Sequence, residues 1–307
     1  MTNAELRGTP TTMPAAAVRD DRILPVTRWV GACIPPFLFV AFVMLFFFPN
    51  NTKDLFAWDI HPPLTPLLMG AGYISGSYFF VRLIFGQRWH RFALGFLPIA
   101  TFTWFMGVAS LLHLDKFNGN QASIIAWMFL YALTPFVVPA LWLINRRTDP
   151  GTPEPGDVLV PPAIRWITGV VGAGMVAIAL GMFLFPDLFT TPKPAAGQPF
   201  VSTGLWPWWV SPLTDQVIAG WFALPGVVGL MLASDRRWSA WRITLESQLL
   251  GVGLILIGVA RAWSDLNPNN GLTWLFLAGM IGLLGYLLGV YLAMESRRRR
   301  AVAAPPA

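Results

Sequence analysis

The chain has 307 residues, of which 55% are hydrophobic and 12% are charged, whereas a soluble domain carries about 25% charged residues. The net charge of +6 comes largely from arginines between apolar runs, so it reports on membrane topology and does not indicate a nucleic-acid partner. The single cysteine, Cys33, excludes both an intramolecular disulfide and a thiolate metal cluster.

Several apolar runs exceed the roughly 18 residues that a helix needs to cross the hydrocarbon core of a bilayer. The predicted fold is therefore an all-α integral membrane protein embedded in a lipid bilayer. No apolar segment typical of a signal peptide precedes the first run, which is expected to direct the chain to the membrane. Eight transmembrane helices are expected, at about residues 29–49, 65–86, 92–113, 122–144, 164–186, 213–233, 243–263 and 272–294.

Basic residues indicate the orientation of these helices, because Lys and Arg concentrate in cytoplasmic loops. If the N-terminus is cytoplasmic, 17 of the 21 Lys and Arg residues fall on that side, and four fall outside: Lys53, Lys116, Lys193 and Arg261. The predicted location is the cytoplasmic membrane, with both termini in the cytoplasm and an even number of spans.

Short motifs recur in the two halves of the chain, in the same order relative to the predicted spans. At a shift of 149 residues, the Pro-Leu-Thr of residues 63–65 aligns with that of residues 212–214, and the Arg-Trp of residues 88–89 with that of residues 237–238. Tryptophans precede each Pro-Leu-Thr. These matches predict two parallel four-helix repeats, related by a pseudo-twofold axis along the membrane normal.

The expected domain organisation follows from the spans and the repeat. Each repeat holds four helices, and a Pro/Gly-rich cytoplasmic segment joins them. The predicted units are a disordered cytoplasmic tail at 1–28, the first repeat at 29–147, the linker at 148–163, the second repeat at 164–296 and a basic cytoplasmic tail at 297–307.

Polar and tryptophan side chains from both halves gather in the predicted outer loops. One interpretation is that the tryptophans form an interfacial belt and that the Asp, Asn and Thr residues cap helices. The other is a ligand pocket between the repeats, near the outer face. The residues predicted to bind a ligand there are Trp58, Asp59, His61, Asp115, Trp209, Asp215, Arg261 and Asp265.

Arg261 is the most informative of these residues, because a charge near the end of a span requires a partner or access to the membrane interface. The equivalent position of the first repeat is Ser110. Asp265, four residues later, would share a helical face with Arg261, and Asp215 is the alternative partner. Arg261 is expected either to extend toward the outer headgroups or to bind an anionic group of a substrate or lipid.

No motif for a metal, a cofactor or catalysis is present. His61 and His113 are both expected on the outer side, but their spacing matches no metal-ligand motif. His90 is expected in a solvated turn. Because no Ser/His/Asp order, phosphate-binding loop or dinucleotide fingerprint is recognisable, no metal, cofactor or catalytic residue is predicted.

Two further patterns concern packing and charge inside the spans. Glycines of the last span, including the Gly285–Gly289 pair, are expected to allow close helix contact, inside the bundle or with another protein. Glu246 is expected to pair with Arg242, one helical turn earlier.

Three functions remain open on these grounds. The first, slightly favoured, is a transporter-like or small-molecule or lipid-binding membrane protein with its site between the repeats near the outer face. The second is a non-catalytic structural or assembly subunit of a larger membrane complex, which would have membrane-protein partners or form a homo-oligomer. The third is a membrane enzyme acting on an extracytoplasmic or lipid substrate, and it has the least support because no acid/base pair is recognisable.

Overall fold

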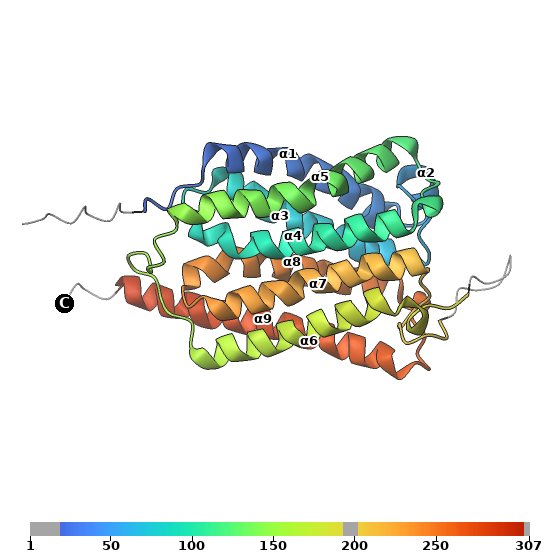
Figure 1. The fold of residues 1–307 in the computed structure, drawn as a ribbon. Coiled ribbons are helices and arrows are strands. Elements are labelled where there is room, and N and C mark those ends of the chain that lie inside the picture. Colours follow the sequence, from blue (N-terminus) through green and yellow to red (C-terminus); the bar gives the residue numbers. More distant parts are fainter. Residues whose placement is uncertain (1–18, 193–201, 304–307) are drawn as a thin grey trace, which may run out of the picture.

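The computed structural model describes residues 19–192 and 202–303. The regular secondary structure of this part consists of helices and two isolated β-bridges. Eight helices are long and apolar enough to span a membrane, as predicted (Figure 1). They are α1 (Pro25–Phe42, extended by the π-helical η1, Val43–Phe47), α3 (Leu64–Phe85), α4 (His90–Leu112), α5 (Gln121–Asn145), α6 (Pro162–Leu184), α7 (Pro212–Ser234), α8 (Trp238–Arg261) and α9 (Gly271–Ala303).

Short helical turns connect the long helices. They are α2 (Thr52–Leu55), η2 (Leu114–Lys116), η3 (Arg146–Thr148), η4 (Pro186–Leu188) and η5 (Trp263–Asp265). Proline at the first turn begins α1, α6 and α7, where a missing N–H costs no hydrogen bond. Asn120 caps α5 and Ser211 caps α7 by accepting from backbone N–H groups of the first turn.

Four helices form the centre of the bundle and four form its periphery. In α3, α4, α7 and α8, between 44% and 61% of the residues in the most apolar window are buried, against 22% to 28% in α1, α5, α6 and α9. The central helices pack in crossed pairs, α4 on α7 and α3 on α8, while α1 packs on α3 and α6 on α7. The centre of the molecule is therefore made by helices from both halves of the chain.

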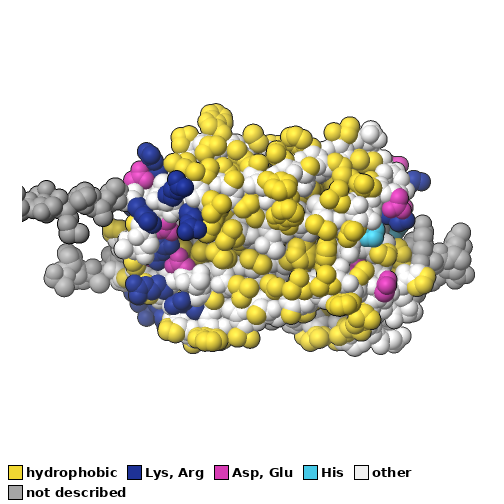
Figure 2. All heavy atoms as spheres, in the orientation of Figure 1, with side chains coloured by type: hydrophobic (Ala, Val, Ile, Leu, Met, Phe, Trp, Pro, Cys, Tyr) yellow, Lys and Arg dark blue, Asp and Glu magenta, His cyan; other side chains and the backbone are white. Residues whose placement is uncertain are grey.

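Apolar side chains cover the flank of the bundle, and arginines gather at the end where α1 begins and α9 ends (Figure 2). We call this the basic end, and the other the opposite end. A broad apolar flank bounded by charged ends is the surface expected of a protein in a bilayer. The chain is a multi-pass, helical, membrane-like protein.

Both halves of the chain are fastened at the basic end in the same way. Arg22 forms an antiparallel β-bridge with Arg88, and Leu159 forms one with Arg237. Residues 1–18 of the predicted N-terminal tail lie outside the described residues, but Asp21 already contacts the bundle through the bond from the Trp89 N–H to its carbonyl, at 2.7 Å. At the other terminus, α9 continues through the four arginines to residue 303.

Glycines allow close contact inside the bundle between α6 and α7, whereas those of the last span, α9, make no such contact within the described chain. A Cβ atom at Gly172 would lie 2.6 Å from the Gly226 carbonyl oxygen, so these helices require glycine at their crossing. By contrast, a Cβ atom at Gly279, Gly282, Gly285 or Gly289 of α9 would meet no heavy atom within 4 Å. The predicted contact of Gly285 and Gly289 inside the bundle is therefore absent, because α9 turns this face outward.

Candidate functional site

A cavity of about 150 Å³ lies in the middle of the bundle, where α3 faces α7, α8 and α9. Its walls include Met69 and Gly72 of α3, Trp221 of α7, Val252 of α8 and Met280 of α9. Carbon atoms dominate the lining, and none of its side chains is charged. The cavity arises because side chains of helices from both halves of the chain meet there without filling the space.

Two polar groups of the cavity wall have no protein partner in the described chain. The indole Nε1 of Trp221 and the hydroxyl of Thr244 are both buried and form no hydrogen bond. Trp221 is held by its ring, which stacks edge-on against Tyr73 with a centroid distance of 5.0 Å and covers Gly72, where a Cβ atom would overlap it. Because buried polar groups are almost always paired, these two groups are candidates for a hydrogen bond to a molecule in the cavity.

A pair of serines closes the cavity on the side of the α3–α8 crossing. The two hydroxyl oxygens of Ser75 and Ser247 are 3.0 Å apart, and Ser247 donates to the Ser75 carbonyl at 2.8 Å. These bonds join α3 to α8 at mid-height, where water is not available to satisfy them. The wall at this point is therefore rigid and polar, opposite the apolar side chains of α7 and α9.

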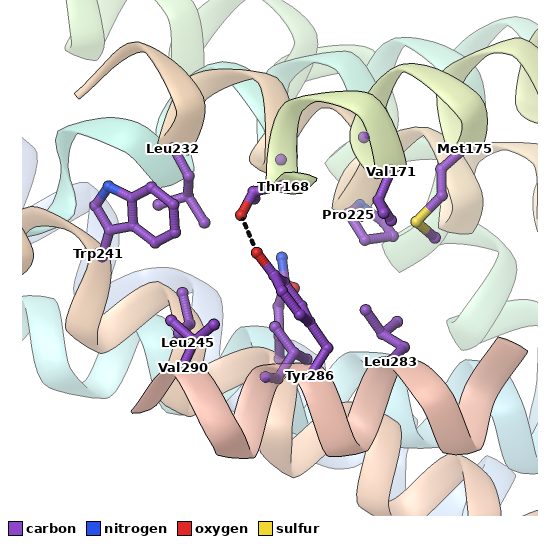
Figure 3. Close-up of a pocket in the computed structure, with 14 residues that line it drawn as sticks. Thr168, Val171, Met175, Pro225, Leu232, Trp241, Leu245, Leu283, Tyr286 and Val290 are labelled. Atoms are coloured by element: carbon purple, nitrogen blue, oxygen red, sulfur yellow. Dashed lines mark hydrogen bonds between the residues drawn. The ribbon is translucent and has the colours of Figure 1, made fainter. Parts of the chain in front are cut away.

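A smaller cavity of about 30 Å³ adjoins the first between α6, α7, α8 and α9 (Figure 3). The two cavities share Met175, Pro225, Gln248 and Leu283 in their walls. The smaller one is crossed by a hydrogen bond of 2.7 Å between the hydroxyls of Thr168 and Tyr286. Figure 3 shows Trp241 and Leu232 on the side away from Met175, so the wall shared with the larger cavity lies at one end of the smaller one.

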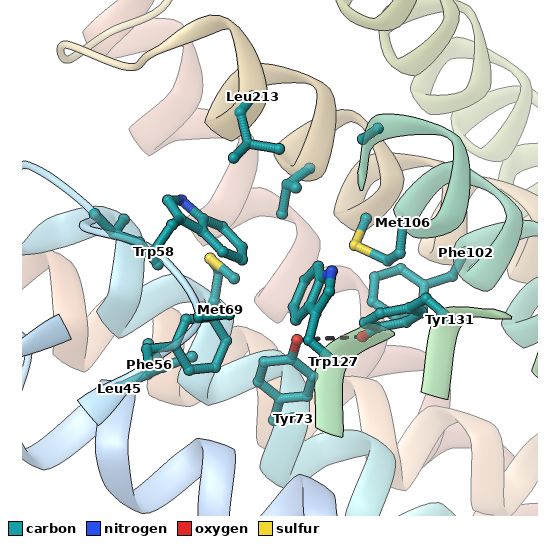
Figure 4. Packing of buried hydrophobic residues seen from close by; sticks show 14 residues of the cluster. Leu45, Phe56, Trp58, Met69, Tyr73, Phe102, Met106, Trp127, Tyr131 and Leu213 are labelled. Carbon is teal, nitrogen blue, oxygen red and sulfur yellow. Dashed lines mark hydrogen bonds between the residues drawn. The ribbon is translucent and has the colours of Figure 1, made fainter. Parts of the chain in front are cut away.

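At the opposite end, the repeated tryptophan and threonine motifs bind each other across the molecule. The indole of Trp58 donates to the Thr214 hydroxyl at 3.4 Å, and the indole of Trp208 donates to the Thr65 hydroxyl at 2.8 Å. Trp58 lies in an aromatic cluster with Trp127, at a centroid distance of 4.8 Å (Figure 4). Trp58 is 2% exposed, so it is a core residue and does not face the membrane surface.

The other predicted ligand residues of the first half lie at the surface of this end. His61 and Asp59 form an ion pair at 3.0 Å and are both about one-third exposed. Asp115 is exposed and pairs with Lys116, and the hydrogen bond from Lys116 lowers the pKa of the Asp115 carboxyl. His113, which was expected on the same side of the membrane as His61, bonds to the Gln216 side chain at 2.9 Å.

Arg261 and Asp265 bind two different elements of the first half of the chain. Arg261 donates to the Phe46 carbonyl at 2.7 Å, and its guanidinium lies 5.1 Å from the centroid of the Phe46 ring. Asp265 accepts from the Leu64 N–H at 2.8 Å and so caps α3, while its own burial raises its pKa. Both residues therefore join the two halves of the chain.

Asp215 and Trp209 complete the predicted set. Trp209 donates from its indole to the Pro192 carbonyl at 3.3 Å. Asp215 lies in the first turn of α7 with 0% of its surface exposed, and neither carboxyl oxygen has a hydrogen-bond partner in the described chain. An unpaired buried carboxyl is unfavourable, so Asp215 is the member of the set whose position the fold alone does not explain.

At the basic end the structure contains a buried series of hydrogen bonds that the sequence did not predict. His90 was expected in a solvated turn, but it is 1% exposed. Its Nδ1 lies 2.5 Å from an Asp21 carboxylate oxygen, and its Nε2 lies 2.9 Å from the Ser239 hydroxyl. Ser239 in turn donates to the Asp157 carboxylate at 2.6 Å. The sequence feature that could have indicated this contact is that His90 and Ser239 each directly follow a copy of the repeated Arg-Trp pair.

This series of hydrogen bonds brings together a serine, a histidine and aspartates, but it joins segments of the fold and does not form a catalytic site. The Ser239 hydroxyl has one proton, and its shortest bond directs that proton toward the Asp157 carboxylate and away from His90. Ser239 is also only 7% exposed. The four side chains clamp the N-terminal segment and the linker onto α4 and α8, and the serine is not activated as a nucleophile.

Within the described residues, no group of three or more His, Cys, Asp or Glu side chains is placed to hold a metal ion. None of the eight predicted ligand residues lines the mid-bundle cavity. In the comparisons with known proteins, no protein-family model, no curated protein and no solved structure matches this chain.

Proposed function

We propose that this chain is a membrane protein that binds a neutral, largely apolar small molecule or lipid chain in the mid-bundle cavity. The observation that carries the proposal is the cavity of about 150 Å³ with two buried donors, Trp221 Nε1 and Thr244 Oγ1, that lack a partner in the described chain. Apolar cavities of about this size stay dry and accept molecules such as benzene or xenon.

The uncharged wall defines the class of ligand. A charged molecule would have to lose its hydration without an ionic partner, which costs several kcal/mol. A neutral molecule with one carbonyl or ether oxygen would satisfy Trp221 or Thr244 and leave its apolar part against Met69 and Val252. Ion-coupled transport needs ionisable groups at the site, so binding of a neutral ligand is the favoured form of the transporter-like function.

We also propose that the two halves are parallel repeats related by a pseudo-twofold axis. The reciprocal bonds of Trp58 with Thr214 and of Trp208 with Thr65 support this arrangement. So do the paired bridges of residues 22 with 88 and 159 with 237. The crossed packing of α4 on α7 and of α3 on α8 is what such an axis would produce. The cavity would then lie beside this axis.

The arginines support a cytoplasmic position for the basic end, and hence for both termini. On this proposal the chain belongs to the cytoplasmic membrane, and the reciprocal tryptophan bonds lie toward the outer side. The cavity is then deeper than the predicted outer-face site, since its walls are at mid-height of α3 and α7.

The proposal is tested by photolabelling the purified protein in lipid nanodiscs with trifluoromethyl-phenyldiazirine, a small apolar probe that reacts with whatever it contacts on irradiation. Mass spectrometry should find label on Trp221 and Met280 of the cavity wall in addition to lipid-facing residues. Val252→Phe, which fills the cavity, should remove the cavity label. Val170→Phe, at a position of α6 that is 62% exposed, is the matched control and should leave it unchanged.

The result that would contradict the proposal is label confined to lipid-facing side chains such as Phe136 and Ile281, which are both 61% exposed. Equal amounts of label on Trp221 and Met280 in Val252→Phe and in the unmodified chain would also contradict the proposal. Each variant is first compared with the unmodified chain by size-exclusion elution, so that loss of label is read only from folded protein.

A second candidate, an assembly subunit, is favoured by the outward face of α9. Small exposed residues follow one another there at spacings of three and four, which is the pattern of close helix–helix contact in membranes. They are Ala278, Gly282, Gly285, Gly289, Ala293 and Ser296. A defined complex after mild detergent extraction that is lost in Gly285→Leu would support this function. A monodisperse single chain in both would exclude it.

A further inference from the structure

We propose that a pocket at the basic end, formed around the turn between α3 and α4, binds the phosphate of an anionic phospholipid. The pocket has a volume of about 460 Å³, and arginines and aromatic or aliphatic side chains share its lining. Arg82 comes from the last turn of α3, Arg88 from the connecting turn and Arg91 from the first turn of α4. This site is separate from the mid-bundle cavity.

The arginines are positioned by two buried carboxylates behind them. Glu154 of the linker binds Arg88 at 3.2 Å and Arg91 at 2.7 Å. Glu246 of α8 binds Arg82 at 2.6 Å and Arg242 at 3.1 Å, the latter as predicted. The side chains of Glu154 and Glu246 are only 10% and 14% exposed, so the pocket presents guanidinium groups and not carboxylates.

The charges do not balance, which leaves the pocket electropositive. Five arginines, 82, 88, 91, 242 and 298, share three glutamates, 154, 246 and 295, so the net charge of this group is +2. The side chains of Arg82, Arg88 and Arg91 are each 40% to 44% exposed. Each guanidinium has five donors, and the glutamates use few of them, so donors remain for a second anion.

Arg28 neutralises the partial negative charge of the α3 C-terminus, which lies beside the pocket. The carbonyls at the end of α3 would repel an anion, because a helix C-terminus carries partial negative charge. Arg28 donates to the carbonyl of Gly86 at 2.9 Å and also to that of Ile84. With these carbonyls neutralised, the pocket lined by Gly86 and Gln87 stays favourable for a phosphate.

The position of the pocket identifies a lipid as the source of the phosphate. Phe85 forms part of the lining and is 79% exposed at the end of a membrane-spanning helix, so it faces the bilayer. Phe92 and Ile243 add apolar surface to the same lining. A phospholipid fits both halves of this surface, with its phosphate on the arginines and its acyl chains beside Phe85. Basic pockets between transmembrane helices bind anionic headgroups in this manner.

The pocket continues into a smaller one of about 40 Å³, which shares Arg82, Arg91 and Ile243 with it. Arg242 and Arg298 of α8 and α9 line this extension together with Glu154, so it holds both guanidinium groups and a carboxylate. A headgroup with a second phosphate or with free hydroxyls would reach it. The site thus joins α3, α4, α8 and the linker, which are the elements that hold the two halves together at this end.

Native mass spectrometry of the full chain in detergent tests the proposal. Phosphatidylglycerol, phosphatidylcholine of the same acyl chains, and inorganic phosphate are added in separate titrations. Phosphatidylglycerol should bind with an apparent Kd at least about tenfold lower than phosphatidylcholine, because phosphatidylcholine carries a choline cation beside its phosphate and the arginines of the pocket repel that cation. Arg88→Gln with Arg91→Gln should remove this preference. Arg146→Gln with Arg147→Gln, which makes the same change of net charge outside the pocket lining, should retain it.

A second variant guards against loss of folding in the double substitution. Gln87 lies in the pocket lining at an exposed position, so Gln87→Glu adds a negative charge without removing an internal contact. It should weaken phosphatidylglycerol binding by a similar factor. Unchanged lipid preference in Gln87→Glu and in the arginine pair would overturn the proposal. Equal saturation by inorganic phosphate, with no advantage for phosphatidylglycerol, would reject the lipid as the occupant.

Discussion

The turn between α3 and α4 and the turn between α7 and α8 contain the same Arg-Trp pair, yet their arginines differ in what they do. Arg237 is 7% exposed and is held by Asp149 at 2.7 Å and by Asp235 at 2.6 Å. Arg88 is 44% exposed and shares one glutamate with Arg91. One arginine is a buried structural cation, and the other faces a pocket.

A single position accounts for much of this difference. Two residues before Arg237 the chain has Asp235, whereas two residues before Arg88 it has Gly86. A side chain at Gly86 would overlap the Phe92 ring, so no carboxylate can be placed there. The first turn therefore supplies no carboxylate of its own, and its half-exposed arginine pairs with Glu154 of the linker, while the second turn supplies the partner itself. Identical motifs consequently indicate identical position in the fold but not identical function.

Among substitutions that test this difference between the two turns, Arg237→Met is expected to change the free energy of unfolding most. Removing one partner of a buried ion pair leaves two carboxylates unpaired, so the free energy of unfolding should fall by about 3 kcal/mol. Arg88→Met should cost less than about 1 kcal/mol, as expected of a half-exposed pair. Both are measured by thermal or denaturant unfolding in detergent, followed by tryptophan fluorescence. Equal losses in the two variants would show that the turns do not differ in this way.

A smaller effect is expected from Asp235→Gly, which makes the second turn resemble the first. Arg237 would keep Asp149 but lose Asp235, which also accepts from the Arg237 N–H at 2.8 Å. Hydrogen bonds to charged groups contribute about 1.5–3 kcal/mol, so a loss near the lower value is expected. The exposed neighbour Arg236→Gln is the control and should change stability little. A loss larger than that of Arg237→Met would contradict the assignment of Arg237 as the centre of this network.

The smallest effect is a pH dependence at Asp149. Burial alone would raise the pKa of this carboxyl, but hydrogen bonds from Arg237 and the Gly151 N–H hold it below its usual value of 3.8. A carboxyl with a lowered folded-state pKa contributes stability above its unfolded-state pKa and loses it as the pH falls through the folded-state value. The stability difference between the unmodified chain and Arg237→Met should therefore be complete at pH 7 and narrow below about pH 4. If the difference in unfolding free energy between the unmodified chain and Arg237→Met stayed the same below about pH 4, this prediction would be wrong.

Much of the fold could be predicted because membrane helices are specified locally. Length, apolarity and end residues place a span, so α7 was expected at 213–233 and runs from Pro212 to Ser234. The larger errors lie at the basic end, where α8 already begins at Trp238, five residues before the predicted start. The segment from 238 to 242 is less apolar than the span, but it continues the helix because the Ser239 hydroxyl binds the linker and the Trp238 indole binds α9.

The candidate sites could be predicted much less well, because they depend on contacts between distant segments. Arg261 was singled out as a charge that requires a partner or access to the membrane interface, and the structure pairs it with the Phe46 carbonyl, 215 residues away in the chain. Trp58 was read as a ligand or interface residue, and its role as a buried donor to Thr214 became visible only when the two halves were seen in contact. No local pattern encodes such pairings.

The sequence by itself determined that this chain is a helical membrane protein with eight spans, because burial of an apolar helix in a bilayer depends on composition along a single segment. Tertiary structure alone decided where space and unpaired polar groups remain. The cavity beside Trp221 and the pocket around Arg88 are both made by four or more helices or connecting segments that converge from different parts of the chain. Their properties follow from which side chains meet and which do not, and that is a property of packing.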